Sequence, residues 1–170
     1  MSLRDLLLRG AVLAALGAVA LRAEVKVGAA FPALTPALVT SLGAGEVPAT
    51  AGQVVLVDFW ASWCAPCKAA FGALAQLQKE FAGRGLVIVA VSVDEKPAAA
   101  AAFVKRLAPN FSTVHDRTQA LVRQVGVPTM PTSYLVGRDG RVRFVQAGFH
   151  GEATERELRR QIELLLAEKS

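Results

Sequence analysis

Strand and helix patterns alternate along this sequence, and this alternation restricts the fold more than any other feature. Two short apolar runs rich in β-branched residues, 53–60 and 86–93, have the composition of strands that are buried on both faces. Between them, large apolar residues recur at helical spacing over 71–81, and a glycine-rich turn at 83–85 ends the helix. The strand-helix-strand order predicts two parallel strands with a helix packed across them.

The alternation continues into the second half of the chain. A helix is predicted over 97–107, because a proline suits its first turn and a second proline follows its end. A short strand is predicted at 111–115. Two further strands, 132–136 and 141–148, flank a tight turn at 138–140 and predict an antiparallel hairpin.

Side chains at capping positions predict the starts of two more helices. Asp116 has a Gln119 three residues later, and Thr154 has a Glu157, which is the spacing of a capping box. Residues 25–50, rich in Gly, Ala and Pro, are expected to be an irregular lead-in with at most one short edge strand. The order β-α-β-α-β-α-β-β-α predicts an α/β fold, with a parallel sheet covered by helices and antiparallel strands added at one side.

The first residues have the layout of a secretory signal. Two arginines precede an uncharged apolar stretch, Gly10 to Leu21, in which Ala18-Val19-Ala20 offers a cleavage site. Because spanning a bilayer takes about 20 apolar residues, the segment could instead remain as a membrane anchor. Residues 1–23 are therefore predicted to be a signal peptide or anchor, and residues 24–170 a folded domain in the periplasm or another extracytoplasmic compartment.

The charge distribution argues against nucleic acid as a partner. Lysine and arginine exceed the acids by 19 to 14, but the charges are scattered and form no basic stripe. The two cysteines are more informative, because a pair so close adds little stability and indicates redox chemistry or metal binding. A metal site could recruit Cys64, Cys67, His115 and His150, but the two histidines are too far apart in sequence for a zinc-ligand pair, and we expect no metal.

Cys64 and Cys67 lie where the strand 53–60 gives way to the helix. A sulfur in the first turn of a helix is close to unpaired backbone N–H groups and to the positive end of the helix dipole, which both stabilise a thiolate. Cys64 is therefore the predicted nucleophile, and Cys67, one turn deeper, would resolve the mixed disulfide. Ala65 and Pro66 separate the sulfurs, and the proline suits the first turn and stiffens the loop.

Residues 55–68, VLVDFWASWCAPCK, closely resemble the active-site segment of thioredoxins. The wider chain resembles the exported TlpA/ResA-type thiol-disulfide oxidoreductases in its leader, its VGAAFP lead-in, an extra strand-helix passage near 88–115, and MPTSYLV followed by RDGRV. The resemblance covers roughly residues 27–168. It implies a thioredoxin-like α/β fold, with a central mixed sheet flanked by helices and an extra β-α insertion. It also implies a redox-active Cys64–Cys67 disulfide and no other cofactor.

Asp58 is an acid in an otherwise apolar strand. Burial should raise the pKa of its carboxyl and suit it to take a proton from Cys67 during resolution. The alternative is an acid that is merely solvated at the end of the strand. The match to thioredoxin favours the proton relay. Because an Asn often stands at this position in the exported relatives, Asp58 makes this site resemble thioredoxin itself more closely.

Pro131 matches the cis-proline of the family, which lies opposite the disulfide. The backbone of Met130 before it would be free to pair with an extended substrate chain. Pro128 competes for this assignment, although the spacing to the following strand and turn favours Pro131. Trp63 is expected to flank the sulfurs as an exposed apolar contact, whereas Trp60 is expected in the core.

The implied function is thiol-disulfide exchange with protein substrates by a monomer. Ala65 and Pro66 carry no charge, whereas strongly oxidising relatives place a His between the cysteines, so a reductant is favoured, supplied by a membrane electron donor of the DsbD/CcdA type. Cytochrome c maturation and copper-site assembly are the candidate roles. Ala70 and Gly72 stand where the cytochrome-maturation members have Glu and Pro, which leaves the specific partner open.

Three other interpretations of the function remain as alternatives. A disulfide oxidase or isomerase would use the same cysteine pair in another direction. A non-enzymatic metal- or peptide-binding module would use the fold without the exchange chemistry. A peroxidase of the peroxiredoxin kind would need a Thr where this sequence has Ala61, and it is disfavoured.

Overall fold

A computed structural model of the protein describes residues 24–43 and 46–168, so the predicted leader lies outside the described residues. None of the helices in these ranges has the length and apolar character that crossing a bilayer requires. The strands are β1 (Thr40–Ser41), β2 (Val54–Trp60), β3 (Leu86–Ser92), β4 (Ser112–His115), β5 (Thr132–Val136) and β6 (Val142–Ala147). The helices are α1 (Ala65–Phe81), α2 (Pro97–Leu107), α3 (Ala120–Val125) and α4 (Glu152–Ala167), with a short 3-10 turn, η1 (Ala82–Arg84), after α1.

The strands form a mixed sheet with the order β1-β4-β3-β2-β5-β6. The central strand β2 runs parallel to β3 and antiparallel to β5. β4 continues the parallel side, and the β5–β6 hairpin forms the antiparallel side. The lead-in supplies β1, a short edge strand antiparallel to β4. The α/β fold predicted from the sequence, with its mixed sheet and added strand-helix passage, is confirmed.

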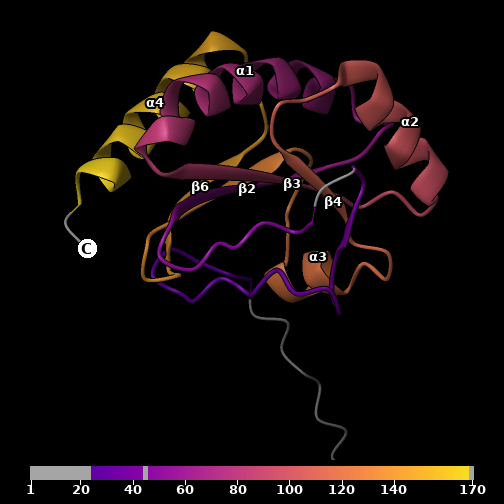
Figure 1. The fold of residues 1–170 in the computed structure, drawn as a ribbon, viewed down its shortest axis with the longest axis horizontal. Helices are drawn as coiled ribbons and strands as arrows, with labels where there is room; N and C mark the ends of the chain where they lie inside the picture. Colours follow the sequence, from indigo (N-terminus) through magenta and orange to yellow (C-terminus); the bar gives the residue numbers. More distant parts are fainter. Residues whose placement is uncertain (1–23, 44–45, 169–170) are drawn as a thin grey trace, which may run out of the picture.

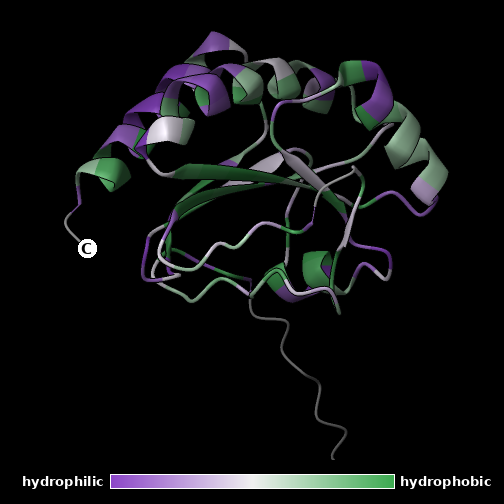
Figure 2. Ribbon diagram, in the orientation of Figure 1, coloured by the Kyte–Doolittle hydropathy of each residue, from purple (hydrophilic) through white to green (hydrophobic). Residues whose placement is uncertain are grey.

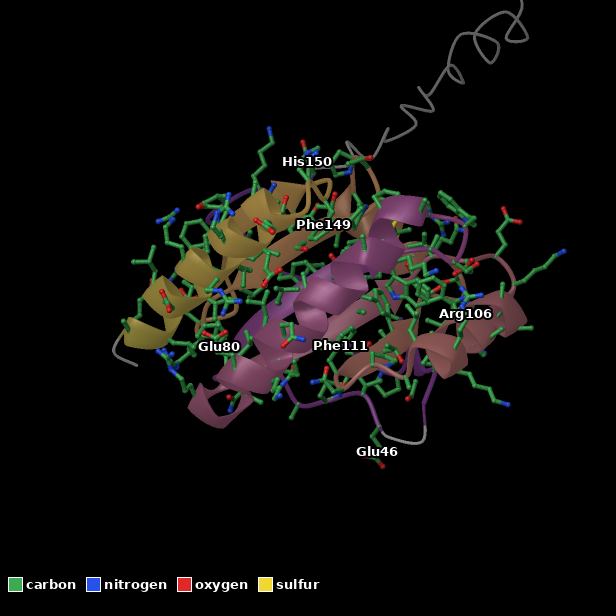
Figure 3. The ribbon with its side chains drawn as sticks, turned by 90° about the horizontal axis from the view of Figure 1, so that it is seen from above. Glu46, Glu80, Arg106, Phe111, Phe149 and His150 are labelled. Carbon is green, nitrogen blue, oxygen red and sulfur yellow. A yellow bond between two sulfur atoms is a disulfide. The ribbon has the colours of Figure 1, made fainter. Side chains whose placement is uncertain are left out.

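Helices cover the two faces of the sheet unequally. α1, α2 and α4 lie on one face, whereas α3 and the lead-in lie on the other (Figure 1). Seen from above, α1 lies between α4 and α2 (Figure 3). Every residue of β2 is buried, and Figure 2 shows hydrophobic residues on the central strands, whereas the covering helices carry both hydrophilic and hydrophobic ones. A strand covered on both sides needs apolar residues without alternation, which is the pattern found in the sequence.

Aromatic side chains fill the space on both faces of β2. Trp60 is fully buried, as predicted, and packs against Phe71 of α1 and Phe103 of α2 with ring centroids 5.0 and 4.7 Å apart. Because side chains alternate along a strand, Phe59 faces the opposite layer. There its ring lies 5.9 Å from that of Tyr134 on β5. The end of β2 is therefore packed from both sides.

The predicted capping box at the start of α3 is wrong. Gln119 is itself the residue before the helix, with φ 54° and no side-chain capping bond. Its amide instead donates to the carbonyl oxygen of Val93 at 3.1 Å. Asp116 does contribute to the helix start, because its Oδ2 accepts from the N–H of Val122 at 2.8 Å.

The capping box predicted for α4 is wrong as well, because the helix begins before Thr154. Gly151 precedes the first helical residue with φ 65°, a conformation that glycine adopts without steric cost. The hydroxyl oxygen of Thr154 accepts from the backbone N–H of His150 at 2.9 Å. Glu157 bonds forward to Arg160 and not back to the helix start.

Phe103→Ala should lower the free energy of unfolding by about 3 to 5 kcal/mol, because it leaves a cavity beside Trp60 and Phe71. Chemical denaturation at one pH measures this loss. Leu164→Ala is the control, since Leu164 is 48% exposed and its truncation should change the free energy by about 0.5 kcal/mol or less. Equal losses in the two variants would contradict the packing of α2 against the sheet.

Candidate redox site

Cys64 and Cys67 lie at the start of α1, just beyond the end of β2. Cys64 is the N-cap residue of the helix, and its Sγ accepts a hydrogen bond from the backbone N–H of Cys67 at 3.2 Å. The two sulfurs are joined in a disulfide. Cys67 is completely buried, whereas Cys64 retains 6% exposure. An incoming group would therefore reach Cys64 first.

The first turn of α1 favours a negative charge on the outer sulfur. Ala65 and Pro66 are exposed and uncharged, and no acidic residue lies in this turn. The N–H of Cys67 already points at the sulfur of Cys64, and the positive end of the helix dipole lies behind it. Both contributions stabilise a thiolate on Cys64 once the disulfide is reduced.

Asp58 is a buried acid and not a solvated one at the strand end. Its side chain is 1% exposed, and its Oδ1 accepts a hydrogen bond from the hydroxyl of Ser133 at 2.6 Å. Its Oδ2 has no hydrogen-bond partner in the described part of the chain. Burial raises the pKa of this carboxyl from 3.8 to about 7, and the Ser133 hydrogen bond opposes that rise.

The carboxyl of Asp58 lies on the same side of the sheet as the cysteines. Trp60, two residues further along β2, packs against Phe71 of α1, and side chains two apart on a strand share a face. Asp58 therefore lies beneath α1, the helix that carries the buried Cys67. This placement fits the predicted proton relay between Asp58 and Cys67.

The peptide bond between Met130 and Pro131 is cis, and Pro128 has no such bond. β5 begins at the next residue, Thr132, which pairs with Phe59 near the end of β2. The hairpin thus brings Pro131 to the edge of the sheet from which the cysteine loop emerges. Neither backbone group of Met130 has a backbone partner within the described residues, so both are available to an extended chain.

Trp63, the residue before Cys64, and Met130, the residue before the cis-proline, line one surface cavity of about 480 Å³. Trp63 is 71% exposed, as predicted, although it adjoins a nearly buried cysteine. The other walls come from Ser62, the connection between β3 and α2 (93–96), the start of α2, and the start of α3. The added α2 therefore contributes to the surface around the redox site.

The two histidines do not join the cysteines. His115 is buried, and its Nε2 lies 2.7 Å from the carbonyl oxygen of Asp94. His150 is exposed where β6 leads into α4 (Figure 3). Across residues 24–43 and 46–168, no group of three or more His, Cys, Asp or Glu side chains is arranged to hold a metal ion.

Residues 26–162, most of the chain, match the sequence profile of the Redoxin family. The protein is a member of this family. Thiol-disulfide oxidoreductase ResA of Bacillus subtilis is 36% identical over 97 residues, which cover 57% of this chain and 54% of that protein. ResA of Bacillus thuringiensis subsp. konkukian is 32% identical over 107 residues, covering 63% of this chain and 60% of that one. The chain therefore spans little more than half the length of the curated relatives that it matches.

Solved structures confirm the thioredoxin-like fold of this Redoxin-family chain. A Chlorobium tepidum protein, named as a candidate thiol:disulfide interchange protein DsbE, superposes with a TM-score of 0.78 at 32% identity, covering 85% of this chain and 100% of that one. StoA from Bacillus subtilis superposes with a TM-score of 0.63 at 22% identity, covering 74% and 94% of the two chains. The likeness to StoA concerns the fold alone.

Two positions depart from the pattern of the cytochrome-maturation members. Ala70 is buried in α1, and Gly72, two residues further along, is exposed. The acid and the proline that the resemblance implies at these positions are absent. Asp58 is therefore the one acidic residue, among those that the sequence analysis singled out, that lies beneath α1.

Sequence reasoning missed Asp94, which contacts the cysteine loop. Asp94 is buried, and both of its carboxylate oxygens accept from the N–H of Ser62. A weak signal was present, because an acid directly after a buried parallel strand lies at the edge where such folds place their sites. Its partner is 32 residues away in sequence, so no local pattern marks the pair.

Asp58→Asn should change how the stability of the oxidised protein depends on pH. The pKa of Asp58 is about 7 in the fold and 3.8 unperturbed, so the folded state holds a proton that the unfolded state releases. The free energy of unfolding of the wild type should therefore fall as pH rises from about 4 to about 7, and the variant should lack this decline. Denaturant titrations across this range measure it, and parallel profiles would contradict the buried acid.

Proposed function

We propose that this protein is a thiol-disulfide oxidoreductase that reduces disulfides in exported proteins. The observation that carries the proposal is the pairing of an outer sulfur, at the N-terminus of α1, with a buried sulfur in the same helical turn. The thiol-disulfide oxidoreductase ResA of Bacillus subtilis and the thioredoxin-like fold support it. It requires only the two thiols and a proton acceptor for Cys67.

In the first step, the Cys64 thiolate of the reduced protein attacks one sulfur of a substrate disulfide. A bond forms between Cys64 and that sulfur, and the other substrate sulfur leaves as a thiolate. The N–H of Cys67 and the dipole of α1 hold the attacking charge. An extended substrate segment would pair with the free backbone of Met130 beside Pro131.

In the second step, Cys67 releases the substrate. Its thiol gives a proton to the carboxylate of Asp58, and the resulting thiolate attacks Cys64. The Cys64–Cys67 disulfide forms, and the second substrate sulfur leaves as a thiolate that takes a proton from solvent. Two electrons pass to the substrate in total. Because the pKa of Asp58 is about 7, this carboxyl can both accept and release a proton near neutral pH.

The direction of transfer follows from what lies between the cysteines. Ala65 and Pro66 offer no positive charge that would add to the stability of the reduced form, so the pair should remain a reductant. The oxidised protein then needs two electrons for the next cycle, and a membrane donor of the DsbD/CcdA type would supply them. The signal-like sequence of residues 1–23 supports an extracytoplasmic location, in which the protein is secreted or tethered and acts as a monomer.

Two classes of substrate fit a reductant in such a compartment. Apocytochromes need reduced cysteines for haem attachment, and copper-site proteins need reduced cysteines for metal binding. A substrate of either class whose disulfide lies in an extended segment would pair with the backbone of Met130. Identifying the trapped partner separates the two.

Cys67→Ser should stop the reaction after the first step, because Cys64 then forms a mixed disulfide that no internal thiol resolves. The variant is incubated in reduced form with an extracytoplasmic extract, and complexes that fall apart with dithiothreitol are identified by mass spectrometry. Cys64→Ser is the matched control and should trap nothing. Both variants should lose insulin reduction, and full activity in a Cys64→Ser, Cys67→Ser double variant would overturn the proposed function.

The reduction potential of the Cys64–Cys67 pair should lie near that of thioredoxin, at about −270 mV. Equilibration with glutathione or dithiothreitol buffers, followed by thiol alkylation, measures it. A value near about −120 mV, typical of the strong oxidant DsbA, would make the protein an oxidase and contradict the direction proposed here.

A further inference from the structure

One buried carboxyl group outside the cysteine pair fixes the loop that presents Cys64. The loop contains a turn in which the N–H of Cys64 donates to the carbonyl oxygen of Ala61 at 3.1 Å. The N–H of Ser62, inside this turn, is satisfied by Asp94, at 3.2 Å from Oδ1 and 3.0 Å from Oδ2. The hydroxyl of Ser62 donates to Oδ1 as well, at 2.6 Å. Both polar groups at this loop position are thus held by a single side chain.

Asp94 is itself held by the ends of β3 and β4. Ser92 donates from its hydroxyl to Oδ2 of Asp94 at 2.8 Å and accepts from the backbone N–H of Asp94 at 3.1 Å. The carbonyl oxygen of Asp94 lies 2.7 Å from Nε2 of His115. Asp94 is 3% exposed, and Ser92 and His115 are buried as well. A buried carboxylate bonded from several directions has one orientation, so its oxygens determine where Ser62 lies.

The same region contacts the loop through a second bond. The N–H of Val93 donates to the carbonyl oxygen of Trp60 at 2.9 Å, where β2 ends. Gln119 donates to the carbonyl oxygen of Val93 at 3.1 Å from the other side. The segment Val93–Asp94 is therefore a rigid support, and the loop from Trp60 to Cys64 lies against it.

We infer that Asp94 is a positioning residue for disulfide exchange, which holds Ser62 so that Cys64 and the adjoining Trp63 face the substrate disulfide. This inference rests on the proposed function. Exchange needs the attacking sulfur in line with the two sulfurs of the substrate, and small displacements of a reacting atom slow such reactions strongly. The disulfide itself fixes Cys64 only in the oxidised form. In the reduced form, which attacks substrate, the Asp94–Ser62 contact continues to hold the loop.

Asparagine cannot replace Asp94 in this role, although it has the same shape. The carboxylate accepts from the N–H of Ser62, the hydroxyl of Ser62 and the hydroxyl of Ser92. An amide offers one acceptor oxygen and turns an NH₂ group toward the remaining donors. The loop should then separate from its support while the sheet, which is held by its own core, stays folded.

The test compares variants in insulin reduction, with the reduced protein as the attacking species. Asp94→Asn should lower kcat/KM by about ten- to a hundredfold. Ser62→Ala loses the side-chain bond and keeps the backbone bond, so its kcat/KM should fall by less. Ser62→Thr keeps the hydroxyl, and its kcat/KM should stay near that of the wild type. Hydrogen exchange of the amides at 62–64 should become faster in Asp94→Asn.

Gln78→Ala controls for a merely structural effect. Oε1 of Gln78 accepts from the backbone N–H of Ile88 at 3.1 Å, nearer the other end of β3, so the variant also loses a bond from a side chain to a strand. It should reduce stability without changing kcat/KM or hydrogen exchange at 62–64. If Asp94→Asn is affected no more than Gln78→Ala in these readouts, Asp94 is structural only.

The outcomes separate this inference from the proposed function. Wild-type rates in both Asp94→Asn and Ser62→Ala, with a wild-type protein that reduces insulin, would overturn the positioning role and leave the proposed function standing. A wild-type protein that fails to reduce insulin would overturn both. If Asp94→Asn does not fold, Ser62→Ala and Ser62→Thr decide, and equal activity of these two variants would contradict the role.

Discussion

The burial of β2 between two layers is the constraint on which the redox site depends. All seven of its residues are buried, with α1 and α2 on one face and the Phe59–Tyr134 contact on the other. A strand packed in this way cannot shift or turn without exposing apolar surface on one side. The point at which the chain leaves the sheet is therefore fixed, and with it the start of α1, where Cys64 meets the first free N–H groups of the helix.

The same burial gives Asp58 its chemistry. A carboxyl among apolar side chains breaks the local pattern of the strand and destabilises the charged form, and Ser133 offsets only part of that cost. Such violations of the folding pattern tend to coincide with function, because a group that is hard to ionise can hold or release a proton near neutral pH. In this fold the acid lies beneath α1, the helix that carries the buried Cys67, and this placement supports the proposed proton relay.

Local sequence patterns were sufficient to find residues whose surroundings are set by their neighbours in the chain. Cys64 and Cys67 follow a buried strand and open a helix, and Asp58 stands out as an acid in an apolar run. The capping boxes failed because α4 begins earlier than Thr154, directly after Gly151, whereas α3 begins later than Asp116, directly after Gln119. Asp94 was missed because its hydrogen-bond partner, Ser62, lies in a different strand-to-helix connection.

The sequence by itself determined the order of strands and helices, the burial of the central strands, and the place of the cysteine pair at a strand-to-helix junction. Those features depend on residue spacing and composition within short segments. Only the tertiary structure decided which face of the sheet receives α2, and that Asp94 meets Ser62. These depend on the register between β2 and β3, in which Trp60 pairs with Ser92, and register is set by the packing of all layers together.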